Sequence, residues 1–231
     1  MTTQTNQPPR KVSVWMYLGA FVISLLIFAV GMFAGKMIDN AKISELQDEL
    51  NSVSRKLESM QLLIMSENAS NSNFCPVYAT QLTELDSDIE KFGYKLTFLE
   101  DVQHVTDTDL KRKYFALEGE AYLLSQKNKA VCNDSSVLLI NFYSNRENAC
   151  SDCRKEGDEV LKARDSLASR GIKVKLFSFD GDLGSPIALA FKTQYGVRTY
   201  PSLVIDEKTY SGYRDSSEIE RLVIQSKTPQ N

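Results

Sequence analysis

Residues 137–153 read VLLINFYSNRENACSDC, and this stretch sets the arrangement of the chain that follows it. The apolar run Val137–Ile140 predicts a buried strand. A polar loop comes next, and Cys150-Ser151-Asp152-Cys153 then opens a segment with helical periodicity. Two cysteines spaced in this way can close a disulfide across the first turn, and the helix N-terminus stabilises a thiolate. Zinc sites use the same spacing, so the motif alone leaves a redox and a metal interpretation open.

A second stretch, YGVRTYPSLVI at residues 195–205, places Pro201 at the start of another predicted strand. Together the two stretches resemble the thioredoxin superfamily, in which a cis-proline faces the C-x-x-C pair. The order of the predicted elements after the cysteines also fits. A helix to about residue 170 precedes a strand at 174–179, and a helix at 186–195 precedes a strand at 202–205. A short strand follows the turn 206–208, and the last helix lies at 216–224. The resemblance covers residues 136–226 and implies an α/β thioredoxin-like domain, a central sheet with flanking helices.

The resemblance also implies roles for four residues. Cys150 would be the exposed nucleophile and Cys153 the resolving thiol that releases the product from a mixed disulfide. Pro201 would shape the substrate groove, and Tyr200 would offer backbone groups to an extended peptide. Thiol- or disulfide-containing proteins would therefore be the partners, and no cofactor is expected.

The sequence departs from thioredoxin at three places. Ala149 stands where thioredoxin has a tryptophan, Asn141 stands where it has a buried acid, and the loop 142–150 is about three residues longer. Asn141 cannot accept a proton from the resolving thiol, which predicts slow turnover. Asp152 lies between the cysteines, and its negative charge disfavours a thiolate, which argues against a strong oxidant.

Residues 12–35 carry no charged side chain and follow an N-terminal tail at 1–11. As a helix they would span about 36 Å, enough to cross a hydrocarbon core of roughly 30 Å. A cleaved signal peptide is the alternative, but its apolar region would be only about 7–15 residues long. We therefore expect an uncleaved single-pass membrane helix in contact with lipid.

The orientation of this helix is weakly encoded. Arg10 and Lys11 precede it, whereas Lys36 and Lys42 follow it. The positive-inside rule then slightly favours a cytoplasmic N-terminus and an extracytoplasmic C-terminal domain. The even number of cysteines, 4, agrees with that side.

Residues 37–66 predict a coiled-coil-like stalk. Apolar residues alternate at spacings of three and four, which is a heptad pattern, at Ile43, Leu46, Leu50, Val53, Leu57, Met60 and Ile64. The flanking heptad positions provide no complementary charge pairs. The stalk either packs on its own domain or forms a parallel homodimer, and the sequence leaves both alternatives open.

Residues 67–74 are a polar linker, and residues 75–132 predict a helical hairpin. Its first helix starts at Pro76 and its second near Asp107, and each has an apolar stripe. If the two helices run antiparallel, Cys75 and Cys132 lie at the same end and can form a structural disulfide. Two unrelated buried thiols are the alternative.

A closed zinc site would need four ligands, and Cys150 and Cys153 supply only two. The chain has 1 histidine, His104, so Cys75 and Cys132 would also have to join. We therefore expect no metal. A formal charge of −3 without a basic run also argues against nucleic acid as a partner.

Two classes of function remain. In the first, the protein is a membrane-anchored thiol–disulfide oxidoreductase that acts on protein or small-molecule disulfides. In the second, it is a non-catalytic, membrane-tethered thioredoxin-fold module that binds or assembles partners through the stalk, and its C-x-x-C is a structural disulfide. The intact cysteine pair and the Pro201 segment favour the enzyme.

Overall fold

The structure is a computed structural model that describes residues 14–65 and 74–227, with the side chains of residues 14 and 38–40 excepted. The predicted tail at 1–11, the start of the predicted membrane span and most of the predicted linker lie outside the described residues. The chain divides into two compact units, of which the first ends at Glu45 and the second starts at Leu46.

In the first unit, α1 (Val14–Met65) carries the predicted membrane span. Among the described residues, α1 is the one helix that is long and apolar enough to cross a membrane, with a mean hydropathy of 2.4 in its most apolar window. No part of that window is buried, and large apolar side chains are exposed from Trp15 to Met37. Such a surface suits a helix that lipid covers.

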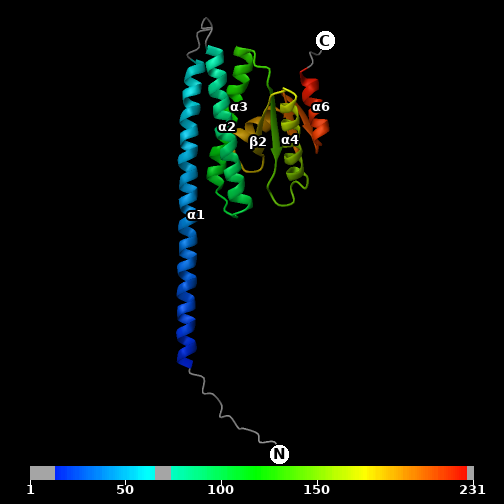
Figure 1. The fold of residues 1–231 in the computed structure, drawn as a ribbon. Helices are drawn as coiled ribbons and strands as arrows, with labels where there is room; N and C mark the ends of the chain where they lie inside the picture. The colour runs from blue at the N-terminus through cyan, green and yellow to red at the C-terminus, as the bar shows by residue number, and fades with distance from the viewer. Residues whose placement is uncertain (1–13, 66–73, 228–231) are drawn as a thin grey trace, which may run out of the picture. The chain divides into compact units, whose positions relative to one another are not determined.

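The second unit begins with the last part of α1, residues 46–65, where the predicted heptad seam lies. Six seam side chains are buried, namely Leu46, Leu50, Val53, Leu57, Met60 and Ile64. Within this unit α1 runs beside α2 (Phe74–Asp101), and Lys56 Nζ lies 2.9 Å from Asp88 Oδ2 (Figure 1). The seam is therefore covered by the chain's own helices, as the first alternative for the stalk requires, and the homodimer stays a prediction.

The hairpin consists of α2 and α3 (Thr108–Cys132). Every residue of the two predicted stripes is buried, namely Tyr78, Leu82, Leu85, Ile89, Phe92, Leu96 and Leu99 on α2, and Leu110, Tyr114, Leu117, Ala121 and Leu124 on α3. Asp107 caps α3, because its carboxylate accepts hydrogen bonds from the N–H groups of Asp109 and Leu110. Helix α2 starts before Pro76, so Cys75 lies in its first turn and not ahead of it.

The four-stranded sheet has the order β2-β1-β3-β4. Strands β1 (Val137–Tyr143) and β2 (Val174–Asp180) are parallel, and β3 (Ser202–Ile205) pairs antiparallel with β1 and with β4 (Lys208–Ser211). Helix α4 (Cys153–Ser169) connects β1 to β2, α5 (Pro186–Gln194) connects β2 to β3, and α6 (Ser216–Ser226) follows β4. This is the topology that the resemblance implied, and it leaves β2 at one edge of the sheet.

Helices cover both faces of the sheet. On one face, Tyr122 of α3 packs edge-on against Phe177 of β2 and Phe191 of α5. On the other, α4 and α6 bury an aliphatic core against β1 and β3, with Leu139, Val160 and Ile219 almost fully covered. This packing holds the start of α4 at the end of the sheet where β1 and β2 terminate.

Candidate active site

The C-x-x-C pair forms a disulfide where the loop after β1 meets α4. Cys150 and Cys153 are joined with their Cα atoms 5.6 Å apart. Cys153 is the first residue of α4 and is 7% exposed, whereas Cys150 precedes the helix and is half-buried. Cys150 is thus the more accessible sulfur, which is the order of exposure that the predicted roles require.

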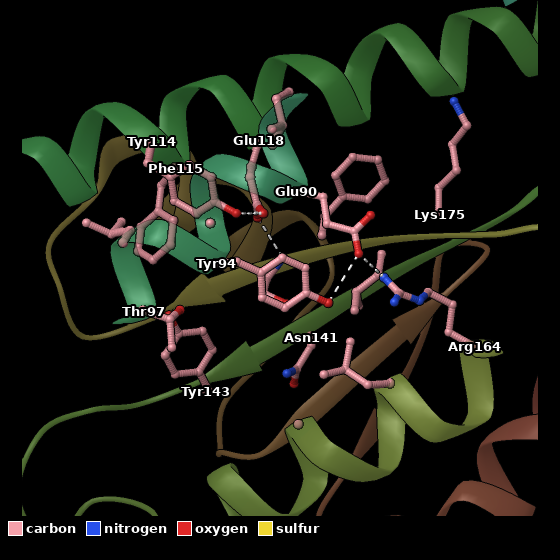
Figure 2. Close-up of a pocket in the computed structure, with 18 of the residues that line it drawn as sticks. Glu90, Tyr94, Thr97, Tyr114, Phe115, Glu118, Asn141, Tyr143, Arg164 and Lys175 are labelled. Carbon is pink, nitrogen blue, oxygen red and sulfur yellow. Dashed lines mark hydrogen bonds and ion pairs between the residues drawn. The ribbon is translucent and has the colours of Figure 1, made fainter. Parts of the chain in front are cut away.

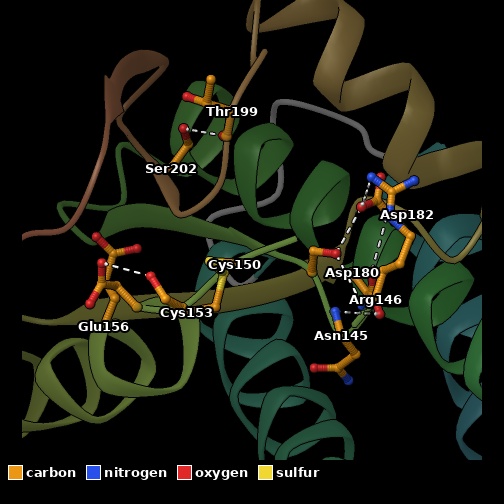
Figure 3. Close-up of a disulfide and its surroundings, with 12 residues drawn as sticks. Asn145, Arg146, Cys150, Cys153, Glu156, Asp180, Asp182, Thr199 and Ser202 are labelled. Carbon is orange, nitrogen blue, oxygen red and sulfur yellow. Dashed lines mark hydrogen bonds and ion pairs between the residues drawn. A yellow bond between two sulfur atoms is a disulfide. The ribbon is translucent and has the colours of Figure 1, made fainter. Parts of the chain in front are cut away.

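The loop 144–149 is fixed by two aspartates at the end of β2. Ser144 Oγ donates to Asp182 Oδ2 at 2.7 Å, and the backbone N–H of Asn145 donates to Asp180 Oδ2 at 3.4 Å. Arg146, at the start of the longer loop, lies 3.6 Å from Asp182 in an ion pair. Figure 3 shows this network on one side of the disulfide. The extra residues of the loop are therefore held in place by β2.

The peptide bond between Tyr200 and Pro201 is cis. Pro201 is buried, and its carbonyl accepts a 2.9 Å hydrogen bond from the N–H of Gly212. The ring of Tyr200 points away toward the β2–α5 connection, where its hydroxyl contacts Lys192 Nζ. Among residues 14–65 and 74–227, no group bonds to the backbone N–H or C=O of Tyr200.

Glu156 lies one turn after Cys153 on the buried face of α4. Its Oε1 accepts a 3.0 Å hydrogen bond from the backbone N–H of Arg214, whereas its Oε2 has no partner. Burial, as the largest effect, raises the pKa of Glu156 to about 7. Figure 3 shows this acid beside the disulfide, on the side opposite Asp180 and Asp182.

Asn141 lies in β1, at the position where the resemblance led us to expect an acid. It is 6% exposed, and its Oδ1 has no hydrogen-bond partner among the described residues. The side chain lines a cavity of about 810 Å³ between α2, α3, β2 and α4 (Figure 2). Cys150 and Cys153 line the same cavity. The disulfide therefore faces a partly open cavity on the hairpin side.

Two ion pairs cross from α2 to α4 and frame the cavity. Arg164 Nη1 lies 2.7 Å from Glu90 Oε1, and Tyr94 also donates to that carboxylate, as Figure 2 shows. Nearer the disulfide, Arg154 Nη2 lies 3.4 Å from Asp101 Oδ2. An adjoining pocket of about 460 Å³ shares several lining residues with the cavity and is also bordered by Asp101 and Arg154.

Glu118 of α3 reaches the outer edge of β2 at the back of the cavity. Its Oε2 accepts a 2.7 Å hydrogen bond from the backbone N–H of Ser178, and its Oε1 accepts one from the Tyr114 hydroxyl. Burial raises the pKa of Glu118 to about 7. This carboxyl group thus takes the place of a neighbouring strand at one position of the sheet edge.

The remaining cysteines are remote in sequence from this site and form the second disulfide. Cys75 and Cys132 are joined with Cα atoms 5.5 Å apart, at the open end of the hairpin. His104 lies in the loop between α2 and α3. In the part of the chain that the structure describes, no group of three or more His, Cys, Asp or Glu residues is arranged to hold a metal ion.

Sequence reasoning did not find several residues around the disulfide. Glu156, Asp180 and Asp182 were not among the predicted site residues, because only the tertiary fold buries Glu156 and Asp180 and brings Asp180 and Asp182 to the loop. Arg146 is exposed and is ion-paired with Asp182. The local sequence indicated burial only for Glu156, because it falls on the same helix face as the apolar residues Val160, Ala163 and Leu167.

No protein-family model and no curated protein sequence matches the chain. Among solved structures, the chain is similar to chloroplastic thioredoxin z, with 18% identity and a TM-score of 0.33 over 44% of this chain and 87% of that one. It is also similar to human ERp44 in its zinc-bound form, with 20% identity and a TM-score of 0.33 over 43% of this chain and 29% of that one. A third similar structure is the first thioredoxin domain of mouse protein disulfide-isomerase A4, with 19% identity and a TM-score of 0.33 over 45% of this chain and 72% of that one. These similarities concern the fold alone. The strand order, the C-x-x-C at the start of α4 and the cis-proline together give the C-terminal part of this chain a thioredoxin-like fold.

Proposed function

We propose that the protein is a membrane-anchored thiol–disulfide oxidoreductase, with its thioredoxin-like domain outside the cytoplasm. The observation that carries the proposal is the difference in exposure within one disulfide. Cys150 is half-buried and accessible, and Cys153 is 7% exposed at the first position of α4. A pair built in this way separates an attacking sulfur from a protected one.

The chemistry follows from this arrangement. In the reduced protein, the Cys150 thiolate attacks a substrate disulfide, one substrate sulfur leaves as a thiolate, and a mixed disulfide forms. The Cys153 thiolate then attacks Cys150 Sγ, which releases the second substrate thiolate and restores the disulfide of the structure. The two electrons passed to the substrate come from the dithiol, and the reverse sequence oxidises a substrate dithiol.

The surroundings support both partners of this exchange. The backbone groups of Tyr200 beside the cis-Pro201 bond, which have no partner among the described residues, suit an extended substrate segment next to Cys150. Glu156 is a buried acid one turn from Cys153 whose pKa of about 7 allows it to take and return a proton near neutral pH. It supplies the proton acceptor that Asn141 cannot be.

The decisive experiment is trapping of mixed disulfides. Cys153→Ser should accumulate disulfide-linked partner proteins that disappear on addition of reductant, because Cys150 can attack but the product cannot be released. Cys150→Ser should trap far less, because Cys153 is recessed. If neither variant traps a partner and the wild-type protein neither reduces nor oxidises a model disulfide, the non-catalytic membrane-tethered module is the better account.

A further inference from the structure

We propose that the cavity between α2, α4 and the outer edge of β2 binds an extended, uncharged segment of a protein substrate while the disulfide of that substrate reacts at Cys150. The proposal rests on the oxidoreductase function proposed above and assigns a substrate-binding surface to it. Cys150 and Cys153 line this cavity, whereas Tyr200 and Pro201 do not. The surface is therefore distinct from the groove beside the cis-proline.

The floor of the cavity is an unpaired strand edge. Strand β2 pairs with β1 alone, and the hydrogen bond from Val137 N–H to the Lys173 carbonyl fixes which residues of β2 face β1. The backbone N–H and C=O groups of Leu176 and Ser178 then point away from β1, toward the outer edge of the sheet. The N–H of Ser178 is already bonded to Glu118. Across residues 14–65 and 74–227, nothing bonds to the outward N–H and C=O of Leu176. An extended peptide can pair with such an edge through its own backbone.

A buried acceptor in the same floor also lacks a donor. Asn141 Oδ1 is unpartnered although the side chain is 6% exposed, and Asn141 lines both the cavity and the adjoining pocket together with Leu176. Buried polar atoms are nearly always hydrogen-bonded in folded proteins, since leaving one unpaired is costly. Once the side chain turns toward the cavity that it lines, a peptide N–H or a side-chain amide of a bound segment would satisfy Asn141 Oδ1.

The wall of the cavity that α4 forms has open space next to Gly157. Gly157 lies in the interior of α4, where glycine is unfavourable relative to alanine. No atom lies within 4 Å of the position that a Cβ would occupy, and Gly157 lines both the cavity and the adjoining pocket. A main chain bound along β2 could approach α4 closely at this point.

Most charges on the walls are paired with one another, and among the described residues Lys173 and Asp158 are the exposed lining residues without an ion pair. Beyond the two pairs that frame the cavity, Lys175 Nζ lies 2.7 Å from Asp86 Oδ2 and Lys111 Nζ lies 2.6 Å from Glu100 Oε2. At most positions of the lining, a charged ligand would have to break such a pair to find a counter-charge. An uncharged segment that donates hydrogen bonds matches the lining instead.

The experiment fills the space at Gly157 in the full-length protein, held in detergent or nanodiscs. Gly157→Trp should obstruct the cavity, whereas Ser169→Trp is the matched control, because it adds the same side chain at an exposed position of α4 that lines neither the cavity nor the adjoining pocket. Turnover is measured with insulin as a protein disulfide and with bis(2-hydroxyethyl) disulfide as an uncharged small one. We expect Gly157→Trp to raise the KM for insulin at least tenfold and to leave the small-disulfide rate within twofold of wild type, and Ser169→Trp to match wild type on both.

Three outcomes would count against the proposal or its basis in different ways. An unchanged KM for insulin in Gly157→Trp would overturn the binding surface, and so would an equal loss of rate on both substrates, which would mean that the tryptophan blocks the disulfide itself. A wild-type protein that is inert towards both substrates would instead refute the oxidoreductase function.

A binding measurement separates these cases. In the redox-inactive Cys150→Ala/Cys153→Ala variant, a blocked, uncharged ten-residue peptide should bind by calorimetry, and a twin with every backbone nitrogen methylated should not. Adding Gly157→Trp should abolish the binding. Equal binding of the two peptides would overturn the role of the β2 edge.

Discussion

The carboxylate of Glu156 accepts a 3.0 Å hydrogen bond from the backbone N–H of Arg214, so α4 is tied to the segment before α6 directly behind the recessed cysteine. Only one carboxylate oxygen takes part, because Oε2 has no partner among the described residues. Glutamine offers the same acceptor without the titration. The structural and the proton-binding roles of Glu156 can therefore be separated by one isosteric substitution.

The first prediction concerns stability and pH. Burial raises the pKa of Glu156 from its ordinary value of 4.5 to about 7, so the folded state binds this proton more tightly than the unfolded state. The stabilisation is complete below about pH 4.5 and is lost as the pH rises through about 7. Urea unfolding should thus show a lower free energy of unfolding at pH 8 than at pH 5, and Glu156→Gln should flatten that dependence and be the more stable protein at pH 8.

Two controls accompany this measurement. Glu118→Gln should remove a separate part of the same slope, because burial raises the pKa of Glu118 to about 7 as well. Glu159 lies on the same helix, but hydrogen bonds from Lys162 and Ser216 lower its pKa to about 2. Glu159→Gln should therefore leave the dependence of stability on pH unchanged between pH 5 and 8. A wild-type slope in Glu156→Gln would contradict the assignment.

The second prediction concerns the Cys75–Cys132 disulfide. It closes a loop with a sequence separation of 57, and its loss should destabilise the protein by about 4 kcal/mol according to chain entropy. The Cys75→Ala/Cys132→Ala variant tests this by denaturant unfolding. The matched Cys150→Ala/Cys153→Ala variant opens a bridge with a separation of only 3 and should change stability much less. Equal losses in the two variants would show that loop length is not the dominant effect.

The third prediction concerns the stalk. Leu57 is 0% exposed, so Leu57→Ala should cost about 2–5 kcal/mol of the free energy of unfolding. Leu62, on the same helix, is 68% exposed, and Leu62→Ala should be close to neutral. If the cost of Leu57→Ala depended on protein concentration, a second copy of the chain would cover the seam instead of the hairpin.

The fourth prediction concerns topology. With Arg10 and Lys11 on the cytoplasmic side, single cysteines introduced at Ser169 and at Thr3 in an otherwise cysteine-free chain should behave differently in intact cells. A membrane-impermeant maleimide should label position 169 and spare position 3. The reverse pattern would place the thioredoxin-like domain inside the cell.

The elements with long, regular apolar patterns could be predicted from the sequence. The stripe from Tyr78 to Leu99 repeats at helical spacing over several turns, and every member is buried. The order of strands and helices after Cys150 was equally readable, and the ends of the predicted elements differ from the structure by two residues at most, as at Ser226 for α6. Local sequence was enough because the helices each carry one apolar stripe and the central strands β1 and β3 are short, almost continuously buried runs.

The rest depended on contacts between distant segments. A heptad seam looks the same whether it packs on its own hairpin or on another copy, so the partner of Leu57 could not be read from its spacing. Glu118 and Ser178 are 60 residues apart, and nothing in either local pattern indicates that a side chain of α3 would bond to an edge strand. The cavity beside the disulfide arises from the same long-range packing.

The buried seam of α1 has a practical consequence for producing a soluble form of the domain. A fragment that starts after the linker, near residue 74, would keep the hairpin and the disulfide pair but lose residues 46–65. It would leave the faces of α2 and α3 that cover Leu50, Leu57 and Met60 open to solvent, and apolar patches of that kind promote aggregation. Truncation just before Leu46, where the second compact unit starts, removes the predicted membrane span and keeps those faces covered.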